Sequence, residues 1–388
     1  MLPDFNNTEI AFQYKSTSEL KQAQFLFSAM HMPTISALGI KLTQWSIKVG
    51  LPVKKAIKNT IFKQFCGGEN LEEAANTAYK MAKFNMNIIL DYSVEGKDAE
   101  VEFDKAVPEF IKAIDFAATQ PNTPFASVKI TGFARFGLLE KIHANETLSD
   151  VEQQEWHRAI ARVDKLCAAG YKNNIRVLID AEETWIQKAV DQLAEIMMVR
   201  YNKEKAIVYN TYQLYCHASL ANMKKDHQTA LQKGYIFGSK LVRGAYMEKE
   251  RERAQLMGYP SPIQPDKAAT DRDFDSATLY CLQHLDTLEL FIGSHNEQSN
   301  LLAATYLDEH NIPRNTTKVY FSQLFGMSDN ISFNLSNAGY KVAKYMPYGP
   351  VKDVVPYLMR RAQENTSVAG QTGRELTLIN KELKRRKG

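Results

Sequence analysis

The sequence predicts an α/β protein, a closed barrel of eight parallel strands that alternate with helices, with a helical arm at its N-terminal end. Two observations predict this fold. Eight short β-rich runs alternate with longer helical stretches from about residue 87 onward, and 388 residues suit one barrel with additions. An open doubly wound sheet is the alternative, but such a sheet normally carries a glycine-rich phosphate loop after its first strand. The segment LDYSVEGKDAE has no GxGxxG pattern, which favours the barrel.

The first 80 residues are expected to form the helical arm. The segments SELKQAQFLFSAM (18–30) and LTQWSIKVGLPVKKAIKNTIFKQF (42–65) place apolar residues at mixed three- and four-residue spacing, which is typical of amphipathic helices. The second segment is also basic. It therefore fits either a helix on an anionic membrane surface or a helix packed on its own protein, and we favour packing.

Each predicted strand is a β-rich run of about ten residues. The eight runs are 85–93, 125–133, 174–183, 206–214, 238–246, 288–296, 318–326 and 340–349. Helical patterns lie between them, such as EVEFDKAVPEFIKAIDFAA, QQEWHRAIARVDKLCAAG, WIQKAVDQLAEIMMVRYN and TALQKGYIFG. We therefore divide the chain into an arm at 1–80, a barrel at 81–370 and a basic C-terminal tail at 371–388.

Composition argues against several classes of protein. Lys plus Arg total 48 against 44 acidic residues, and a net charge of +4 is too weak to indicate nucleic acid as a partner. Four cysteines lie far apart without a CxxC pair, which argues against a zinc site or a disulfide scaffold. No apolar run reaches the roughly 18 residues of a membrane span, and the N-terminus does not resemble a signal peptide. We expect a cytoplasmic protein.

Polar residues stand at the ends of the predicted strands. The active sites of barrel enzymes form at the C-terminal ends of the strands, so these positions are candidates for chemistry. A single polar strand end is usually the start of a loop, but many at one rim indicate a shared pocket. The residues in such places are Lys129, Asp180, Glu182, Glu183, Gln213, Arg243, His295, Gln323 and Tyr345.

The last predicted unit carries the most specific local pattern, YMPYGPVKDVVPYLMRRAQEN (345–365). A helix that begins after Pro350 places Tyr357 and Arg360 on one face, with Arg361 about 100° around the axis. Arginine suits bidentate binding of a carboxylate or phosphate, although an arginine pair near a helix end is often only solvated.

The chemistry of the rim points to a bound organic cofactor. The rim is rich in cations and aromatic residues, and no Ser or Cys with a partner His, or carboxylate pair of glycosidase type, is identifiable. His295 in GSHN has no neighbouring histidine, so we expect no metal. Such a pocket suits an anionic cofactor that performs redox chemistry on a small carboxylate.

Five motifs resemble, in order and spacing, those of flavin-dependent proline dehydrogenase. They are DAEE, KLVRGAY followed by MEKERERA, GSHN, QLFGM and YMPYG…YLMRRAQEN, and they span roughly residues 80 to 370. The resemblance implies a distorted, TIM-like (β/α)8 barrel that binds FAD without covalent attachment. It also implies oxidation of L-proline to Δ1-pyrroline-5-carboxylate, the first step of proline catabolism to glutamate, with electrons passed to a membrane quinone.

The resemblance assigns roles to individual residues. Asp180 and Lys240 match catalytic positions, Asp180 helping to organise the flavin and Lys240 standing near flavin N5. Tyr345 leaves little room for a ring hydroxyl, which favours proline over hydroxyproline. The residues that match substrate contacts are Lys129, Leu324, Tyr345, Tyr357, Arg360 and Arg361. The residues that match FAD contacts are Ala181, Gln213, Val242, Arg243, Gly244, Ala245, Ser294, His295 and Glu364.

One position departs from the pattern of the family. Many bacterial members read RLVKGAY, whereas this chain reads KLVRGAY, so Lys240 replaces an expected arginine and cannot form the same fork of hydrogen bonds. The chain is expected to be monofunctional, with a separate pyrroline-5-carboxylate dehydrogenase acting downstream. A peripheral contact with the inner face of a membrane is a further hypothesis, with the mitochondrial inner membrane expected in a eukaryote. Two alternatives stay open: a Schiff-base aldolase that uses Lys129, and a non-catalytic flavin-binding barrel.

Overall fold

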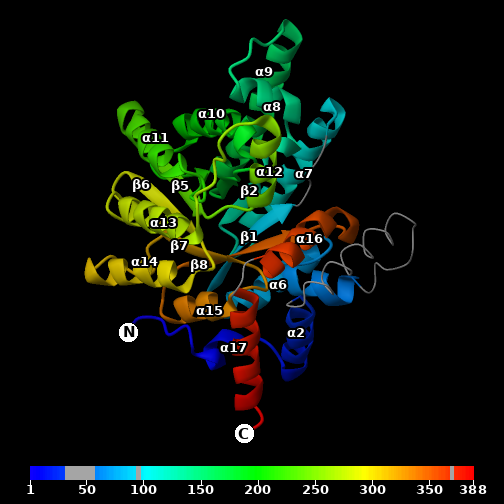
Figure 1. Ribbon diagram of the computed structural model, residues 1–388, viewed down its shortest axis with the longest axis vertical. Helices are drawn as coiled ribbons and strands as arrows, with labels where there is room; N and C mark the ends of the chain where they lie inside the picture. The colour runs from blue at the N-terminus through cyan, green and yellow to red at the C-terminus, as the bar shows by residue number, and fades with distance from the viewer. Residues whose placement is uncertain (31–56, 93–97, 368–370) are drawn as a thin grey trace.

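Eight parallel strands close into a barrel at the centre of the molecule. The computed structural model describes residues 1–30, 57–92, 98–367 and 371–388. Each strand pairs with the next, and β1 closes the ring against β8 in a register that runs from Met86 opposite Val342 to Tyr92 opposite Tyr348 (Figure 1). The strands are β1 (Met86–Tyr92), β2 (Phe125–Val128), β3 (Arg176–Ile179), β4 (Val208–Gln213), β5 (Phe237–Val242), β6 (Leu288–Gly293), β7 (Val319–Leu324) and β8 (Val342–Tyr348). The predicted barrel is confirmed, and each strand begins within one of the eight runs or one residue before it.

Helices separate the strands and cover the outside of the barrel. The helices of the barrel units are α7 (Glu100–Ala118), α8 (Phe136–His143), α9 (Asp150–Asn173), α10 (Thr184–Tyr201), α11 (Ser219–Lys233), α12 (Met247–Met257), α13 (Lys267–Leu282), α14 (Glu297–Glu309), α15 (Asp329–Asn337) and α16 (Val351–Ser367), with the 3₁₀ turn η2 (Ile130–Gly132). The pattern TALQKGYIFG is only partly helical. Gly234 ends α11 with φ +67°, and β5 begins at Phe237.

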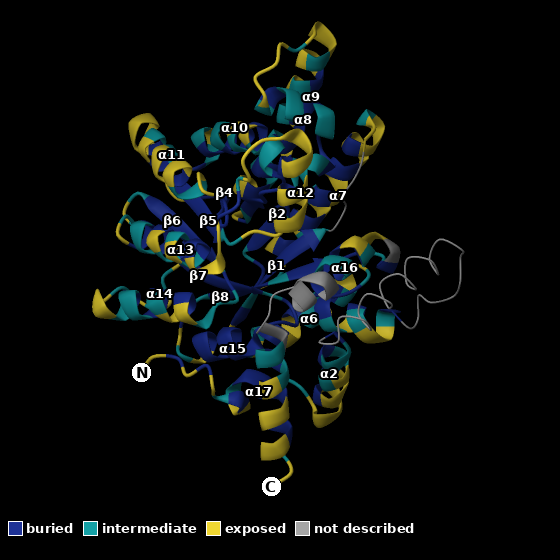
Figure 2. Cartoon of the chain, viewed as in Figure 1, coloured by how far each residue is buried: buried dark blue, intermediate teal, exposed yellow. Residues whose placement is uncertain are grey.

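The barrel interior is packed with aromatic side chains, which close its N-terminal end. The ring centre of Phe125 lies 5.1 Å from that of Phe291 and 4.7 Å from that of Tyr320, both edge to face. At the same end, Arg176 Nη2 lies 3.3 Å from Glu289 Oε2. Most strand residues are buried, whereas the outer faces of the helices are exposed (Figure 2). Because this end is filled, a ligand can approach only from the C-terminal ends of the strands.

The two ends of the chain pack together beside the barrel, next to α15 (Figure 1). The residues that we expected to form a basic tail form helix α17 (Gln371–Arg385), which packs on the helices of the first segment. Leu378, Ile379 and Leu383 are buried in this contact because they recur on one face of α17. The helices of the first segment are α1 (Thr8–Phe12), α2 (Thr17–Met30), the π-helix η1 (Lys58–Phe62), α5 (Lys63–Phe65) and α6 (Leu71–Ala82).

The expected basic segment has only a partial counterpart among the described residues. Of the basic segment 42–65, only residues from 57 onward are described, as η1 and α5; the rest lies outside the described residues. The proposed division at residues 80 and 370 stays a prediction. Among the described helices, none is both long and apolar enough to cross a membrane.

Candidate active site

A cluster of charged side chains centred on Asp180 lies at the C-terminal ends of the strands. Asp180 directly follows β3. Its Oδ1 lies 2.5 Å from Nζ of Lys240, and the hydroxyl of Tyr345 donates to its Oδ2 at 2.9 Å. Nζ of Lys129, which directly follows β2, lies 4.0 Å from the same Oδ2. Four residues selected from the sequence, on four different barrel units, therefore meet at one carboxylate.

Two positive charges keep the Asp180 carboxylate ionised. Burial alone would raise its pKa, but the ammonium groups of Lys240 and Lys129 outweigh burial and lower that pKa below its ordinary value. The Lys240 ammonium also lies 5.3 Å from the ring centre of Tyr345. Burial and the nearby Asp180 charge raise the pKa of Tyr345, so its hydroxyl keeps its proton and serves as a donor.

Asp91 belongs to this cluster but is absent from the residues selected from the sequence. It lies in β1, is 2% exposed, and its Oδ1 lies 4.0 Å from Nζ of Lys129. Lys129 is therefore placed between two carboxylates. The signal that could have found Asp91 is the acidic residue that interrupts the apolar run NMNIILDYS near the C-terminal end of the first strand.

Polar contacts hold the segment that follows Asp180. Gln213 Nε2 donates to the backbone oxygen of Glu182 at 2.7 Å. The Glu182 carboxylate accepts from Thr131 Oγ1 at 2.6 Å and from its backbone N–H at 3.1 Å. Burial raises the pKa of Glu182 to about 7, although the Thr131 bonds oppose the rise. Ala181 is buried in the same segment, beside Gln213 at the end of β4.

The rim formed by β5 and β6 combines close backbone packing with a cation. Gly244 has φ +134°, and a Cβ there would lie 2.4 Å from the ring of Tyr215, so only glycine fits. The Arg243 guanidinium donates to Asp271 at 2.8 Å and to Ser294 Oγ at 2.7 Å. Val242 ends β5 and Ala245 follows Gly244. A fixed positive charge at this rim fits the phosphates of a dinucleotide cofactor.

His295 follows β6 and is held through both ring nitrogens. Its Nδ1 lies 2.9 Å from Ser328 Oγ, and the backbone N–H of Leu324 points to its Nε2 at 3.4 Å. Burial, and then the positive charges of Lys344, Arg361 and Arg243, lower the pKa of His295 to about 3. The imidazole is therefore neutral at physiological pH.

Helix α16 carries three of the remaining predicted substrate contacts, and β7 carries the fourth, Leu324. Arg361 is 6% exposed, and its guanidinium carbon lies 5.1 Å from the ring centre of buried Tyr357, one turn earlier. Arg360 is half-buried. Leu324 stands opposite Tyr345 in the register of β7 and β8. Glu364 lies in α16, but its side chain is outside the described residues.

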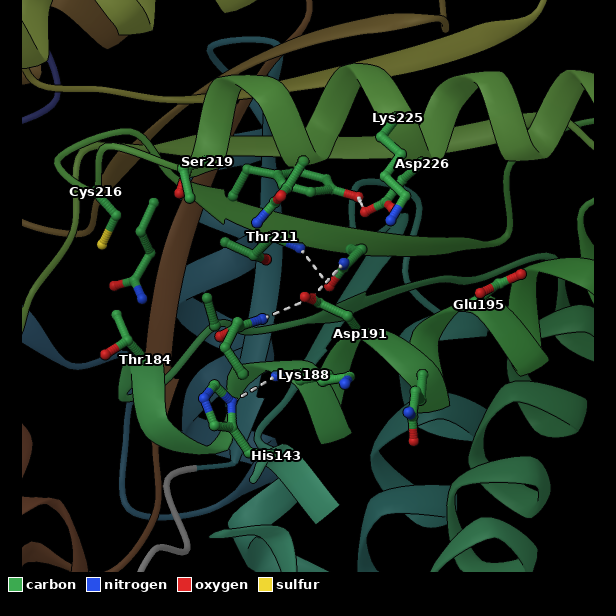
Figure 3. A pocket seen from close by; sticks show the side chains of 18 of the residues that line it. His143, Thr184, Lys188, Asp191, Glu195, Thr211, Cys216, Ser219, Lys225 and Asp226 are labelled. Atoms are coloured by element: carbon green, nitrogen blue, oxygen red, sulfur yellow. Dashed lines mark hydrogen bonds between the residues drawn. The ribbon is translucent and has the colours of Figure 1, made fainter. Parts of the chain in front are cut away.

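A separate cavity of about 540 Å³ lies between α10 and α11 (Figure 3). Its polar floor is bonded within itself: Asp191 accepts from Asn210 and Gln187 at 2.9 and 2.8 Å, and the Tyr212 hydroxyl donates to Asp226 at 2.8 Å. We therefore regard it as a gap between two helices. The residues that it shares with the candidate site are Ala181 and Gln213.

Metal-ligating residues are not clustered in the part of the chain that the structure describes. No group of three or more His, Cys, Asp or Glu side chains there has an arrangement that could hold a metal ion. All four cysteines are buried and unpaired with one another.

Comparison with known proteins decides the family. The model of the family described as proline dehydrogenase matches residues 74–374. The chain belongs to the proline dehydrogenase family. This membership agrees with the resemblance drawn from the motifs, and it makes the chain an oxidoreductase with a barrel fold.

Relatives named for proline and for hydroxyproline are similar to the chain to the same degree. Proline dehydrogenase 1 of Dictyostelium discoideum, a mitochondrial protein, is 31% identical over 98% of this chain and 74% of its own length. The hydroxyproline dehydrogenase of Xenopus laevis is 30% identical over 97% of this chain and 88% of its own. Overall identity therefore does not distinguish the two substrates.

A solved structure supports the fold. Proline utilization A from Bdellovibrio bacteriovorus superposes with a TM-score of 0.73 at 20% identity over 94% of this chain. The chain spans only 37% of the length of that protein. At this level of identity the likeness supports the barrel fold and no more.

Proposed function

We propose that this chain is a flavin-dependent proline dehydrogenase that oxidises L-proline to Δ1-pyrroline-5-carboxylate, the first step of proline catabolism to glutamate. The observation that carries the proposal is the cluster of Lys129, Asp180, Lys240 and Tyr345 at the open end of a barrel of this family. When bound, FAD would supply the redox chemistry by accepting a hydride from the substrate.

The cations of the site bind and orient the substrate carboxylate in this proposal. Lys129, Arg360 and Arg361 supply three positive charges, and arginine forms the stronger, bidentate contacts with a carboxylate. Lys129 is only 13% exposed, and Arg361 is buried, so their charges are less screened than surface charges are. Tyr345 and Leu324, which are neighbours across β8 and β7, form an apolar wall for the substrate ring.

Non-covalent FAD binding is supported by the β5 and β6 rim. Gly244 allows the backbone to turn with φ +134° against the Tyr215 ring, and Arg243 adds a cation whose position Asp271 and Ser294 hold. Gln213, Ala181 and His295 complete this rim in the proposal, with the other predicted FAD contacts. Lys240 would present its ammonium to the flavin while Asp180 holds it in place.

We further propose a quinone as electron acceptor and a separate pyrroline-5-carboxylate dehydrogenase as the next enzyme. A quinone resides in a membrane, so this acceptor requires peripheral contact with a membrane surface, cytoplasmic or, in a eukaryote, mitochondrial. The aldolase alternative depended on Lys129 alone and gains no support from the family match.

Replacement of Arg361 by Met tests the assignment of the carboxylate site. The Michaelis constant for proline should rise by roughly 30-fold or more, since truncating one partner of a buried charge pair costs about 2–5 kcal/mol. The matched control is Arg272→Met, which removes an exposed arginine of α13 and should leave the constant unchanged. An unchanged constant in the Arg361 variant would show that the carboxylate binds elsewhere.

A further inference from the structure

The turn between β7 and α15 contacts His295 from both of its ends. Leu324 stands at one end of this turn and Ser328 at the other. Ser328 is buried and has φ +48° and ψ +44°, a left-handed conformation that is uncommon for serine. A strained residue of this kind costs about 1–3 kcal/mol and persists only where its surroundings hold it in place.

Ser328 is held by one contact from the barrel and one from outside it. Its hydroxyl meets Nδ1 of His295 at 2.9 Å. Its backbone N–H donates to Oε2 of Glu375 at 3.2 Å, and Glu375 belongs to α17, near the end of the chain. Glu375 is 7% exposed, so solvent does not compete strongly for this contact.

A buried ion pair supports the same turn. Nζ of Lys344, on β8, donates to the backbone oxygen of Met327 at 2.6 Å and lies 2.9 Å from Oδ1 of Asp329, the first residue of α15. Both side chains are 1% exposed. The Tyr14 hydroxyl, just before α2, donates to Oδ2 of Asp329 at 2.6 Å. The first segment, the barrel and the last helix therefore converge on one turn.

The hydrogen bonds around His295 select one tautomer. The backbone N–H of Leu324 can only donate, so Nε2 must accept and Nδ1 must carry the hydrogen. The Nδ1–H group then donates to Ser328 Oγ. The Ser328 hydroxyl could donate or accept, so the Leu324 N–H decides the tautomer, and the contact with Ser328 fixes the rotation of the ring that keeps Nε2 facing that N–H.

We propose that Ser328 is a positioning residue that fixes the ring orientation of His295 and so keeps its Nε2 facing the Leu324 N–H, and that Glu375 of α17 holds Ser328 in its left-handed conformation. The consequence for cofactor binding rests on the proposed function, because His295 is assigned to the flavin rim there. In this account, α17, which follows the barrel in the chain, acts on the active site through one serine.

Nitrogen NMR of the histidine rings tests the proposal on the full chain, with and without added FAD. The protein is labelled with ¹⁵N-histidine, and the signals that disappear in His295→Gln are assigned to His295. In the wild type these signals should be those of the Nδ1–H tautomer. Ser328→Gly removes the hydroxyl but adopts the left-handed conformation without strain, so the chain should fold. The His295 ring is then free to turn away from the Leu324 N–H, and its signals should shift toward a mixture of the two tautomers. FAD should then bind roughly three- to tenfold more weakly, the effect of about one lost hydrogen bond.

Matched variants separate positioning from general damage. Ser336→Ala removes another buried hydroxyl of α15, which donates to Phe84 and not to His295, and should leave the His295 signals unchanged. Glu375→Gln keeps an acceptor for the Ser328 N–H and should resemble the wild type. Glu375→Leu removes that acceptor and should shift the signals as Ser328→Gly does.

The possible results are distinguishable. A folded Ser328→Gly protein with unchanged His295 signals, or an equal shift in Ser336→Ala, would overturn the proposal. If the signals shift as expected but no variant, wild type included, binds FAD, the positioning of His295 is supported and the proposed cofactor is wrong.

Discussion

Asp180 and Lys240 form a buried ion pair that Tyr345 and Lys129 also approach. Burying two charges is favourable only where their geometry is good and the remaining hydrogen-bonding positions are filled. An arginine in place of Lys240 could occupy both oxygens of the carboxylate with its fork, whereas a lysine donates as a point charge. Lys240 contacts one oxygen here, and the other accepts from Tyr345. The lysine thus leaves Asp180 able to hold the tyrosine.

Lys240→Met should destabilise the protein because Asp180 would keep its buried charge without its principal partner. We expect the free energy of unfolding to fall by about 3 kcal/mol, within the range for broken buried pairs. Urea denaturation at pH 7 measures this loss. Lys240→Arg keeps the positive charge and serves as the control, with an expected loss under about 1 kcal/mol. Equal stability of the Met variant and the wild type would contradict the role of the pair.

The contribution of the Asp180–Lys240 pair to the free energy of unfolding should depend on pH. The pKa of Asp180 is lowered in the folded state, so its stabilising effect is complete above the unfolded pKa, about 4, and is lost as pH falls through the folded pKa. In Lys240→Met the buried Asp180 loses its main partner, which raises its pKa, so the stability difference between wild type and Lys240→Met should be largest near neutral pH and shrink as the solution becomes more acidic. A difference that grows on acidification would have the wrong sign.

Tyr345 is expected to set the preference between proline and hydroxyproline. Tyr345→Ser opens space beside the substrate ring and removes the hydrogen bond to Asp180. The ratio of kcat/KM for proline to that for hydroxyproline should fall by roughly tenfold or more, because contacts of this size discriminate by about 1–3 kcal/mol. Tyr345→Phe removes only the hydroxyl and should keep most of the preference. If both variants keep the full ratio, another residue determines specificity.

Among the elements of the fold, helix α17 packs on the first segment and also contacts Ser328 through Glu375. Leu378 is 1% exposed in its contact with the first segment. Leu378→Ala should lower the free energy of unfolding by about 2–5 kcal/mol, the usual cost of a cavity in a well-packed core. Leu301→Ala, at an exposed position of α14, is the control and should cost less than about 1 kcal/mol. A negligible loss in Leu378→Ala would mean that α17 is only loosely attached.

The elements also show which features of the fold can be read from the sequence. The eight strands could be predicted because parallel barrel strands are buried on both faces and so appear as short β-rich runs. The packing of residues 371–388 was missed because the charges of NKELKRRKG dominate that stretch, while the apolar face of the helix is narrow. The predicted helical pattern TALQKGYIFG runs past the end of α11 because Gly234, which ends the helix, lies within the pattern.

At the scale of the whole molecule, the positions of single charges are harder to predict than the fold. Strand ends of a barrel meet at one rim, so Lys129, Asp180 and Tyr345 could be selected by position alone. Lys344 is adjacent to Tyr345 but points to the outside of the barrel, where its partner Asp329 comes from another element. Such a pair depends on three-dimensional packing, and neither residue has a local pattern that reveals it.

We propose that the rim of this barrel holds a flavin that proline reduces. The most direct test is the visible absorption spectrum of the purified, FAD-loaded protein under anaerobic conditions, before and after the addition of L-proline. We predict the band of oxidised flavin before addition, its bleaching by proline, and much slower bleaching in Arg361→Met at the same proline concentration. A colourless protein that takes up no FAD, or a flavin band that proline leaves unchanged, would contradict the account.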